Sequence, residues 1–268
     1  MAGMSGLHIH IREKRFDGAA VLGECCIEAA PGEFIALVGP SGAGKSTLLS
    51  LVAGLDDDYD GEINWEGRPL SAPGQSPAHM GMMFQEPRLM PWLSALDNVK
   101  LAEAERSAHE PGYRSRAAGL LEEVGLGEAL HVWPNHLSGG MQRRVALARA
   151  FVVEPQLLLM DEPFVSLDMP TGNRLRRSLL QLCERQRPLV LFVTHDLREA
   201  LALADRVVFL GGTPARVLLD HPVEGARGKD LESAEVAAAQ QALLARYPRL
   251  LSGILDPGQP LATHEDTA

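Results

Sequence analysis

Long apolar runs are missing from this chain of 268 residues. No stretch approaches the roughly 18 uninterrupted apolar residues that a membrane-spanning helix needs. The first ten residues, Met1–His10, also lack the apolar core of a signal peptide. We therefore expect the chain to stay on the cytosolic side of the membrane.

Cysteine is also scarce, with 3 residues in the whole chain. Cys25 and Cys26 are adjacent and Cys183 is distant, so the spacing fits neither a zinc site nor a disulfide framework. We predict that all three are small packing residues.

Positive charge is in deficit. The chain has 25 Lys and Arg against 35 Asp and Glu, which gives a formal net charge of -10. Such a chain repels a phosphate backbone, so no nucleic-acid partner is expected. Because 46% of the residues are hydrophobic, the chain can build a sizeable core in one large or two small domains.

Short apolar runs alternate with helical segments along the chain. Phe34–Val38 predicts a strand that Gly39 and Pro40 close, and Lys45–Ala53 predicts a helix that ends at Gly54. Three later apolar runs are too short for helices and are typical of buried parallel strands: Leu157–Met160, Leu189–Val193 and Val207–Leu210.

Other segments have a different pattern of apolar and polar residues. Gly61–Gly67 alternates as an exposed-face strand does, and Arg114–Val124 predicts an amphipathic helix, which indicates a small β portion and a helical insertion within an α/β core. The run Asp56–Asp58 is interpreted as a solvated turn rather than a metal site. A helix is predicted from the N-cap candidate Ser233 through Tyr247, packed on the core.

The strongest local signal is Gly39–Ser46, with the sequence GPSGAGKS. It fits a phosphate-binding loop, in which glycines let backbone N–H groups turn toward phosphates and the following helix presents its positive end. Lys45 would reach the β- and γ-phosphates, Ser46 would bind Mg²⁺ and Thr47 would meet the α-phosphate. The predicted phosphate-binding residues are Gly39, Pro40, Ser41, Gly42, Ala43, Gly44, Lys45, Ser46 and Thr47. This loop alone is compatible with kinases, GTPases, ATPases and motor proteins.

A second element narrows that choice. Leu157–Pro163 predicts a buried strand from whose carboxyl end Asp161 and Glu162 emerge, where parallel sheets bind ligands. Asp161 would hold Mg²⁺, and Glu162 would polarise an attacking water molecule. Read in isolation, the same pair could equally be a solvated acidic loop.

A third element is Leu137–Ala150, in which Ser138 and the pair Gly139–Gly140 open a strongly helical run. This could be a simple capped helix or a second anion-binding helix start. Two such starts in one chain make sense if two copies face each other head to tail, each nucleotide lying between one copy's loop and the other's Ser-Gly-Gly turn. Hydrolysis would then require a dimer.

In combination, these motifs resemble the ATP-binding subunit of ATP-binding-cassette (ABC) transporters, and the resemblance extends from about Leu7 to Leu219. It implies an α/β fold, with a P-loop NTPase (ABC ATPase) core that carries a small antiparallel β portion and a helical insertion. It also implies an ATP-binding domain over residues 5–220, with the insertion at about 86–155, and a short helical C-terminal extension over 221–268.

The resemblance assigns further roles by motif. Gln85 senses Mg²⁺ and couples to the membrane partner, Asp168 contacts the opposite subunit, and His195 bonds the γ-phosphate and steadies the attacking water. Phe16 is the best-placed candidate to stack on adenine, although it could equally be a core residue. By this resemblance the catalytic residues are Lys45, Glu162 and His195; the Mg²⁺ ligands are Ser46, Gln85 and Asp161; and Ser138, Gly139 and Gly140 bind ATP.

Two features lie outside these assignments. The fifth signature position, more commonly Gln in the family, is Met141 here, so no polar contact with the opposite nucleotide is assigned to it. His8 and His10 share one face of a strand, but two ligands without a third make a poor metal site.

The segment Pro91-Trp92-Leu93 resembles the corresponding segment in the ABC ATPase subgroup that serves nitrate, sulfonate and taurine importers. Trp92 is either an anchor for a permease helix or a buried residue of the insertion. The resemblance implies an importer ATPase that uses ATP and Mg²⁺ as a homodimer on two integral membrane permease subunits, served indirectly by a periplasmic or extracellular substrate-binding protein. Its place would be the cytoplasmic face of the bacterial inner membrane. An ATPase of an exporter or envelope complex and a soluble, non-transport ABC ATPase remain alternatives.

Overall fold

The computed structural model describes residues 6–70, 79–109 and 115–255, with side chains left out over 105–109. The chain forms two compact units. Unit 1 comprises Met1–Ala78 and Leu189–Ala268, and unit 2 comprises His79–Pro188. Among the described residues, no helix has both the length and the apolar character needed to cross a membrane.

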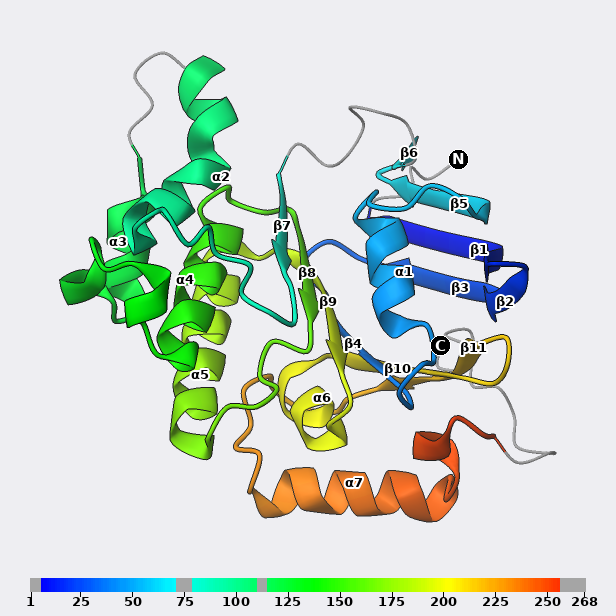
Figure 1. Ribbon diagram of the computed structural model, residues 1–268. Coiled ribbons are helices and arrows are strands. Elements are labelled where there is room, and N and C mark those ends of the chain that lie inside the picture. Colours follow the sequence, from blue (N-terminus) through cyan, green and yellow to red (C-terminus); the bar gives the residue numbers. More distant parts are fainter. Residues whose placement is uncertain (1–5, 71–78, 110–114, 256–268) are drawn as a thin grey trace. The chain divides into compact units, whose positions relative to one another are not determined.

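Unit 1 contains an antiparallel sheet built around the long strand β1 (Figure 1). Strand β1 pairs with β2, β3 and β5, and β5 pairs with β6. In β1, alternate residues Leu7, Ile9 and Ile11 are buried, as a half-buried strand requires. The bounds are β1 Leu7–Phe16, β2 Ala19–Leu22, β3 Cys25–Ala29, β5 Asp60–Trp65 and β6 Arg68–Pro69.

Unit 1 also contains a mostly parallel set of strands. Strand β4 lies between β9 and β10 and is parallel to both, while β11 is antiparallel to β10. Every residue of β4, β9 and β10 is buried, which is typical of parallel strands covered on both faces. The bounds are β4 Phe34–Val38, β9 Leu189–Thr194, β10 Arg206–Gly211 and β11 Arg216–Pro222.

The helices of unit 1 are α1 (Lys45–Val52), α6 (Leu197–Leu203) and α7 (Ala234–Arg246), followed by the 3₁₀ turn η3 (Leu250–Ser252). The Ser233 side chain accepts a hydrogen bond from Val236 N and caps α7 as predicted. Helix α7 contacts α6, and η3 contacts β10, so the predicted packing of the C-terminal helix on the core is confirmed.

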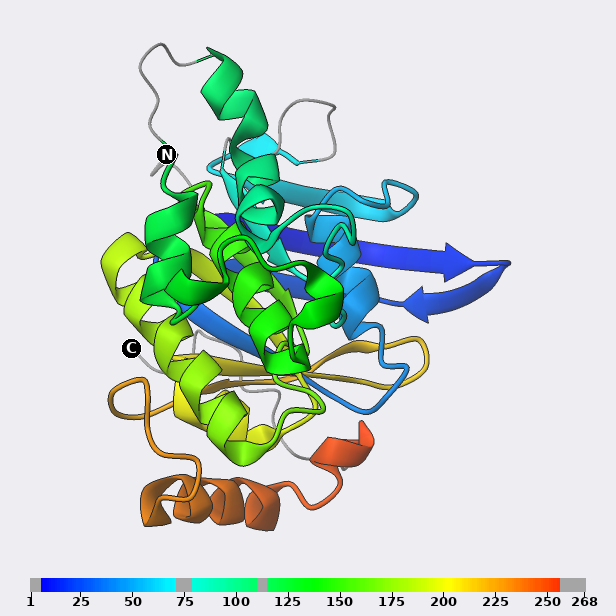
Figure 2. The ribbon, with the colours of Figure 1, turned by 60° about the vertical axis from the view of Figure 1, so that its left-hand side comes forward.

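Unit 2 pairs two parallel strands, β7 (Met80–Met83) and β8 (Leu157–Asp161), with a group of helices. Helix α4 contacts α2, α3, α5 and β7, and Figure 2 shows α4 in green beside α5 in yellow-green. A Cβ on Gly81 would lie 2.3 Å from Ala150 O, so β7 approaches α4 too closely for a side chain. The bounds are α2 Ala95–His109, α3 Ala117–Glu123, α4 Gly139–Phe151 and α5 Met169–Gln186, with 3₁₀ turns η1 Gly127–Ala129 and η2 Pro134–His136.

The predicted strands and helices are present, with small shifts at their ends. Helix α3 begins at Ala117, whereas the sequence pattern predicts a start at Arg114, which lies outside the described residues.

The cysteine prediction is right for two residues and wrong for one. Cys25 and Cys183 are buried, but Cys26 is exposed because it occupies the outward-facing position of alternating strand β3. Burial raises the pKa of the Cys25 thiol to about 11, so this thiol stays protonated at neutral pH.

Candidate functional site

The predicted phosphate loop leaves the end of β4 and leads into α1. Gly44, which precedes the helix, has a φ of 70°, a left-handed conformation that favours glycine. A Cβ there would lie 2.4 Å from Leu22 Cδ2, and a Cβ on Gly39 would lie 2.3 Å from Leu210 O. The loop is therefore packed tightly against β2 on one side and β10 on the other. The loop residues between β4 and Gly44 are Gly39, Pro40, Ser41, Gly42 and Ala43.

Lys45 begins α1 and is buried at 6% exposure. Its Nζ donates hydrogen bonds to Gly39 O at 2.8 Å and to Pro40 O at 2.9 Å, so the ammonium lies inside the curve of the loop. Ser46 is exposed and Thr47 is half-buried in the same first turn, at the positive end of the helix dipole. This arrangement of a cation, two hydroxyls and a helix start suits a polyphosphate.

Phe16 is the last residue of β1 and is 47% exposed, so it is not the core residue that the alternative interpretation required. It pairs with Ala19 of β2, and the same hairpin strand ends at Leu22, which contacts the phosphate loop at Gly44. The hairpin thus brings an accessible aromatic ring onto the strand pair that supports the loop. Such a ring can stack on a base.

Lys14 lies beneath this ring and was not predicted. The pairing of β1 with β5 is irregular between Ile11 and Glu13, and this shift turns Lys14 onto the buried face. The Lys14 side chain is 2% exposed, and its Nζ lies 4.6 Å from the Phe16 ring centroid, a cation–π contact.

The acidic turn supplies the counter-charge. Lys14 Nζ donates to Asp56 Oδ1 at 2.8 Å and to Asp58 O. Burial lowers the pKa of Lys14, but the two carboxylates outweigh it and hold that pKa above its usual value, so the amine is charged. The interpretation of Asp56–Asp58 as a solvated turn fits Asp58, whose side chain is 92% exposed. It did not include the ion pair between Asp56 and Lys14.

Replacing Lys14 with Met is expected to lower the free energy of unfolding by about 1–3 kcal/mol, because Asp56 loses its charged donor and is left with the bond from Asp58 N. The Lys14 hydrogen bond holds the pKa of Asp56 below its usual value. The stabilisation is therefore complete above about pH 4 and is lost as the pH falls through the lower folded-state pKa. Urea denaturation at several pH values should show a wild-type advantage that shrinks in acid; a constant difference would argue against the ion pair.

His195 follows β9 and is exposed. Thr194 pairs with Val38 in the parallel register, so His195 and the phosphate loop leave neighbouring strands at the same edge of the sheet. The turn is fixed by Thr194 Oγ1, which donates to Glu199 Oε2 at 2.9 Å and accepts from Asp196 N at 3.0 Å. Unit 1 therefore gathers the loop, Phe16 and His195.

Asp161 and Glu162 lie half-buried in unit 2, at the carboxyl end of β8. Glu162 has a φ of 44°, a left-handed conformation that costs a residue with a side chain about 1–3 kcal/mol and is concentrated at functional sites. Arg143 of α4 is buried and donates to Pro163 O at 2.9 Å. This bond helps to hold the turn that carries Glu162.

Gln85 leaves the same edge of unit 2 as Asp161, because Met83 and Met160 pair in the parallel register of β7 and β8. Gln85 is exposed. Arg149, near the end of α4, holds the chain beyond it by donating to Pro87 O at 2.7 Å and to Arg88 O at 2.8 Å. The helix that the Ser-Gly-Gly turn opens therefore also braces the segment after Gln85.

The Ser-Gly-Gly turn is both a helix cap and an exposed surface. Ser138 Oγ accepts from Met141 N at 3.3 Å, and Ser138 and Gly139 are exposed. A Cβ on Gly140 would lie 2.3 Å from Thr171 Cγ2, and Thr171 N donates to Asp168 Oδ1 at 3.0 Å. Unit 2 thus brings the signature turn and the Asp168 turn together.

Trp92 is 67% exposed, so its interpretation as a buried residue is wrong. The loop that carries it is held by Asn98, which is fully buried and was not predicted. Asn98 Oδ1 accepts from Met90 N at 2.7 Å, and Nδ2 donates to the carbonyls of Met90, Leu93 and Ser94 at 3.0–3.1 Å.

Replacing Asn98 with Ala is expected to cost about 2–4 kcal/mol of stability, because several buried backbone groups lose their partner at once. Urea denaturation measures the loss, and limited proteolysis should show faster cleavage between Met90 and Ser94. Lys100→Ala, an exposed change on the same helix, is the control. Equal stability of both variants would contradict this role.

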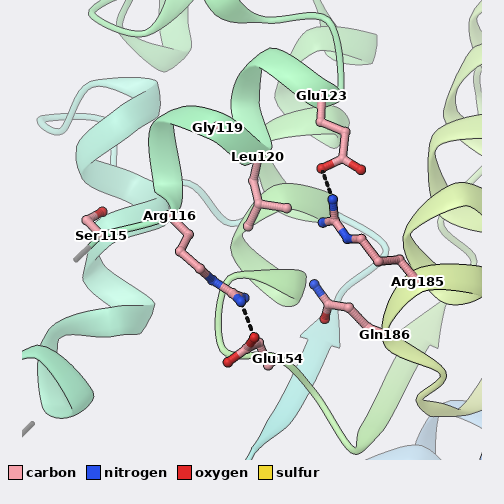
Figure 3. A pocket seen from close by; sticks show the side chains of 8 residues that line it. All are labelled: Ser115, Arg116, Gly119, Leu120, Glu123, Glu154, Arg185 and Gln186. Atoms are coloured by element: carbon pink, nitrogen blue, oxygen red, sulfur yellow. Dashed lines mark hydrogen bonds and ion pairs between the residues drawn. The ribbon is translucent and has the colours of Figure 1, made fainter. Parts of the chain in front are cut away.

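A cavity of about 730 Å³ in unit 2 lies apart from the predicted site residues (Figure 3). Two ion pairs lie on its wall, Arg116 with Glu154 and Arg185 with Glu123, and they balance its charge. None of the predicted ATP- or Mg²⁺-binding residues lines it. The lining residues are Ser115, Arg116, Gly119, Leu120, Glu123, Glu154, Arg185 and Gln186.

One of the two histidines of β1 has an acidic neighbour on β3. His8 Nδ1 lies 3.4 Å from Glu28 Oε1 across the sheet. Within residues 6–70, 79–109 and 115–255, no three or more His, Cys, Asp or Glu side chains are grouped so as to hold a metal ion.

Comparisons with known proteins find one matching family profile and relatives that are similar over most of the chain. A family profile described as ABC transporter matches residues 23–165. The chain is 42% identical to the aliphatic sulfonates import ATP-binding protein SsuB 2 of Burkholderia cenocepacia, over 91% of this chain and 87% of the relative. It is 37% identical to the aliphatic sulfonates import ATP-binding protein SsuB of Bacillus subtilis, over 90% of this chain and 94% of the relative.

Among solved structures, the fold is similar to a dimeric post-hydrolysis state of the ATP-binding cassette MJ0796 bound to ADP and Pi. The TM-score is 0.71 and the sequence identity is 29%, over 82% of this chain and 100% of that chain.

Proposed function

We propose that this chain, which belongs to the ABC transporter family, is the ATP-hydrolysing subunit of an importer. The transported solute is an aliphatic sulfonate or a related small molecule such as taurine or nitrate. The observation that carries this proposal is similarity over nine-tenths of the chain to sulfonate import subunits, in a chain whose phosphate loop and capped signature helix are both formed.

The predicted family, fold and ATPase activity are confirmed. The boundaries 5–220 and 221–268, the insertion at about 86–155 and the individual site residues stay predictions.

ATP binding is assigned first to residues of unit 1. Phe16 stacks on adenine, and the loop N–H groups with Lys45 hold the phosphates. Lys45 exchanges its bonds with the Gly39 and Pro40 carbonyls for bonds with the β- and γ-phosphates.

Three residues of the proposed site have donors that suit Mg²⁺. Ser46 offers a hydroxyl, Gln85 an amide carbonyl and Asp161 a carboxylate, and these hard oxygens are the ligands that Mg²⁺ prefers. When bound, Mg²⁺ neutralises charge on the phosphates as the γ-phosphoryl group is transferred.

Hydrolysis is assigned to Glu162 and His195. Glu162 accepts a proton from the attacking water or orients it, and the bond from Arg143 to Pro163 O helps to hold the turn that carries it. His195, exposed beside the phosphate-loop edge, donates to the γ-phosphate and steadies that water.

The site is completed by a second copy of the chain. Ser138, Gly139 and Gly140 of one copy bind the nucleotide held by the other, and Asp168 contacts the opposite subunit. The exposed signature turn and the dimeric form of the similar cassette support this assignment. Closure of two copies on two ATP molecules drives paired permease subunits between inward- and outward-facing states, and hydrolysis reopens them.

The remaining partners follow from the importer assignment. The permease subunits dock near exposed Trp92, at the cytoplasmic face of the bacterial inner membrane. A periplasmic or extracellular binding protein delivers the solute, and no nucleic acid takes part.

Co-expression with candidate permease genes from the same organism, followed by purification and reconstitution in proteoliposomes, tests the proposal. We expect the membrane subunits to co-purify, and we expect ATP-dependent uptake of an alkanesulfonate, taurine or nitrate with its binding protein. ATP-dependent movement in the opposite direction would establish an exporter instead. A chain that co-purifies with no membrane protein and hydrolyses ATP at full rate as a monomer would overturn the proposal.

A further inference from the structure

The last described turn of the chain is docked on the end of β10. It is drawn in red beyond α7 in Figure 1 and comprises η3 and Gly253. Leu250 is fully buried, and Gly253 N donates to its carbonyl at 2.9 Å. Gly212 N donates to Gly253 O at 3.0 Å, so backbone hydrogen bonding fixes Gly253 against the residues that follow the strand.

This turn reaches the phosphate loop. A Cβ on Gly253 would lie 2.9 Å from Pro40 Cγ and 3.3 Å from Pro40 Cδ. On its other side, a Cβ on Gly211 would lie 2.5 Å from Gly253 Cα. The C-terminal turn is therefore packed between the end of β10 and the second residue of the loop, with no room for a methyl group.

The contact of Gly253 with the Pro40 ring can change the shape of the phosphate loop. The Pro40 carbonyl accepts from Ala43 N at 3.2 Å and from Lys45 Nζ at 2.9 Å, so it sets both the curve of the loop and the position of the ammonium. The proline ring fixes φ, so a push on Cγ is passed to the peptide rather than absorbed by rotation.

We propose that Gly253 is a positioning residue for ATP binding, through which the C-terminal turn supports Pro40 and holds the phosphate loop in its binding shape. This inference rests on the proposed function, because it takes the loop to bind ATP, and it adds a role for the segment that follows α7. Displacing the turn would change the affinity for nucleotide without touching Glu162 or His195, to which hydrolysis is assigned.

Gly253→Ala in the full chain is the first test. The added methyl group must displace Pro40 by several tenths of an ångström, and we expect KM and Kd for ATP to rise about tenfold while kcat at saturating ATP stays within about twofold. Binding is measured with a fluorescent ATP analogue, and hydrolysis by phosphate release.

Gly67→Ala is the matched control. Gly67 is in the same unit and has a φ of 74° against 75° for Gly253, but a Cβ there would meet nothing within 4 Å. Both variants therefore carry similar backbone strain, and only Gly253→Ala presses on the loop. An equal rise of KM in both would show that strain alone is responsible and would overturn the inference.

A double variant tests the contact itself. Pro40→Ala removes Cγ and Cδ, so Pro40→Ala with Gly253→Ala should have nearly the KM of Pro40→Ala alone. Strictly additive effects would contradict the inference. If Gly253→Ala does not fold, a chain ending at Ser252 replaces it: it removes the Gly253 support without adding a methyl group and should also raise KM.

Failure of this inference is distinct from failure of the proposed function. If the wild-type chain neither binds nor hydrolyses ATP, the proposed function is wrong. If the wild type binds ATP and folded Gly253→Ala binds it equally well, only the role of Gly253 is wrong.

Discussion

Glu162→Gln is expected to bind ATP as tightly as the wild type and to turn it over about 10²–10⁴-fold more slowly, the loss typical of a missing general base. Gln has nearly the shape of Glu, so the left-handed turn at this position, with a φ of 44°, should be retained. The amide cannot accept the proton that the carboxylate takes from water. The change therefore separates chemistry from binding.

Single-turnover phosphate release and ATP-analogue binding measure the two effects. ATP-bound dimers of Glu162→Gln should also accumulate in size-exclusion chromatography, because reopening follows hydrolysis. Glu128→Gln, an exposed change in η1 of the same unit, is the control and should hydrolyse ATP at the wild-type rate. Full activity of Glu162→Gln would show that another group activates the water.

The parts of the site that could be predicted are those in which neighbouring residues determine the structure. β4, its glycine-rich loop and α1 occupy consecutive positions, and the apolar run, the Gly-Pro break and the helix start are all visible in the sequence. The caps formed by Ser138 and Ser233 are equally local, since each bonds to an N–H three residues away.

The parts that could not be predicted depend on residues far apart in the chain. Lys14 and Asp56 are 42 positions apart, and only the irregular pairing of β1 with β5 turns Lys14 inward. Nothing near Gly253 indicates its contact with Pro40, because that contact follows from the packing of the turn on β10. For the bond between Lys14 and Asp56, the sequence offered one signal, which is that Lys14 lies two residues before Phe16.

The role of Asn98 could not be predicted from the sequence for a different reason. Its bonds to Met90, Leu93 and Ser94 span at most eight positions, so distance along the chain did not hide them. An Asn in a helical run is ordinarily an exposed polar residue, and composition does not reveal that this one is fully buried. Burial is a property of the packed unit, which periodicity alone does not fix.

Lys45→Ala is expected to abolish tight ATP binding. Hydrogen bonds to a charged group contribute about 1.5–3 kcal/mol each, and two such bonds to the β- and γ-phosphates correspond to a loss of at least about 10²-fold in affinity. The lysine lies inside the curve of the loop, bonded to the Gly39 and Pro40 carbonyls, and residues 39–47 contain no other Lys or Arg that could replace its charge.

A thermal shift experiment distinguishes this loss from that of Glu162→Gln. Saturating ATP should raise the Tm of the wild type and of Glu162→Gln by similar amounts, because a ligand stabilises the state that binds it, and should leave Lys45→Ala unchanged. Lys45→Ala should also have a slightly lower Tm without nucleotide, since the Gly39 and Pro40 carbonyls each lose a charged hydrogen bond, although Pro40 O keeps its bond from Ala43 N. An equal ATP-induced rise in all three proteins would mean that the backbone N–H groups and the helix start hold the phosphates by themselves.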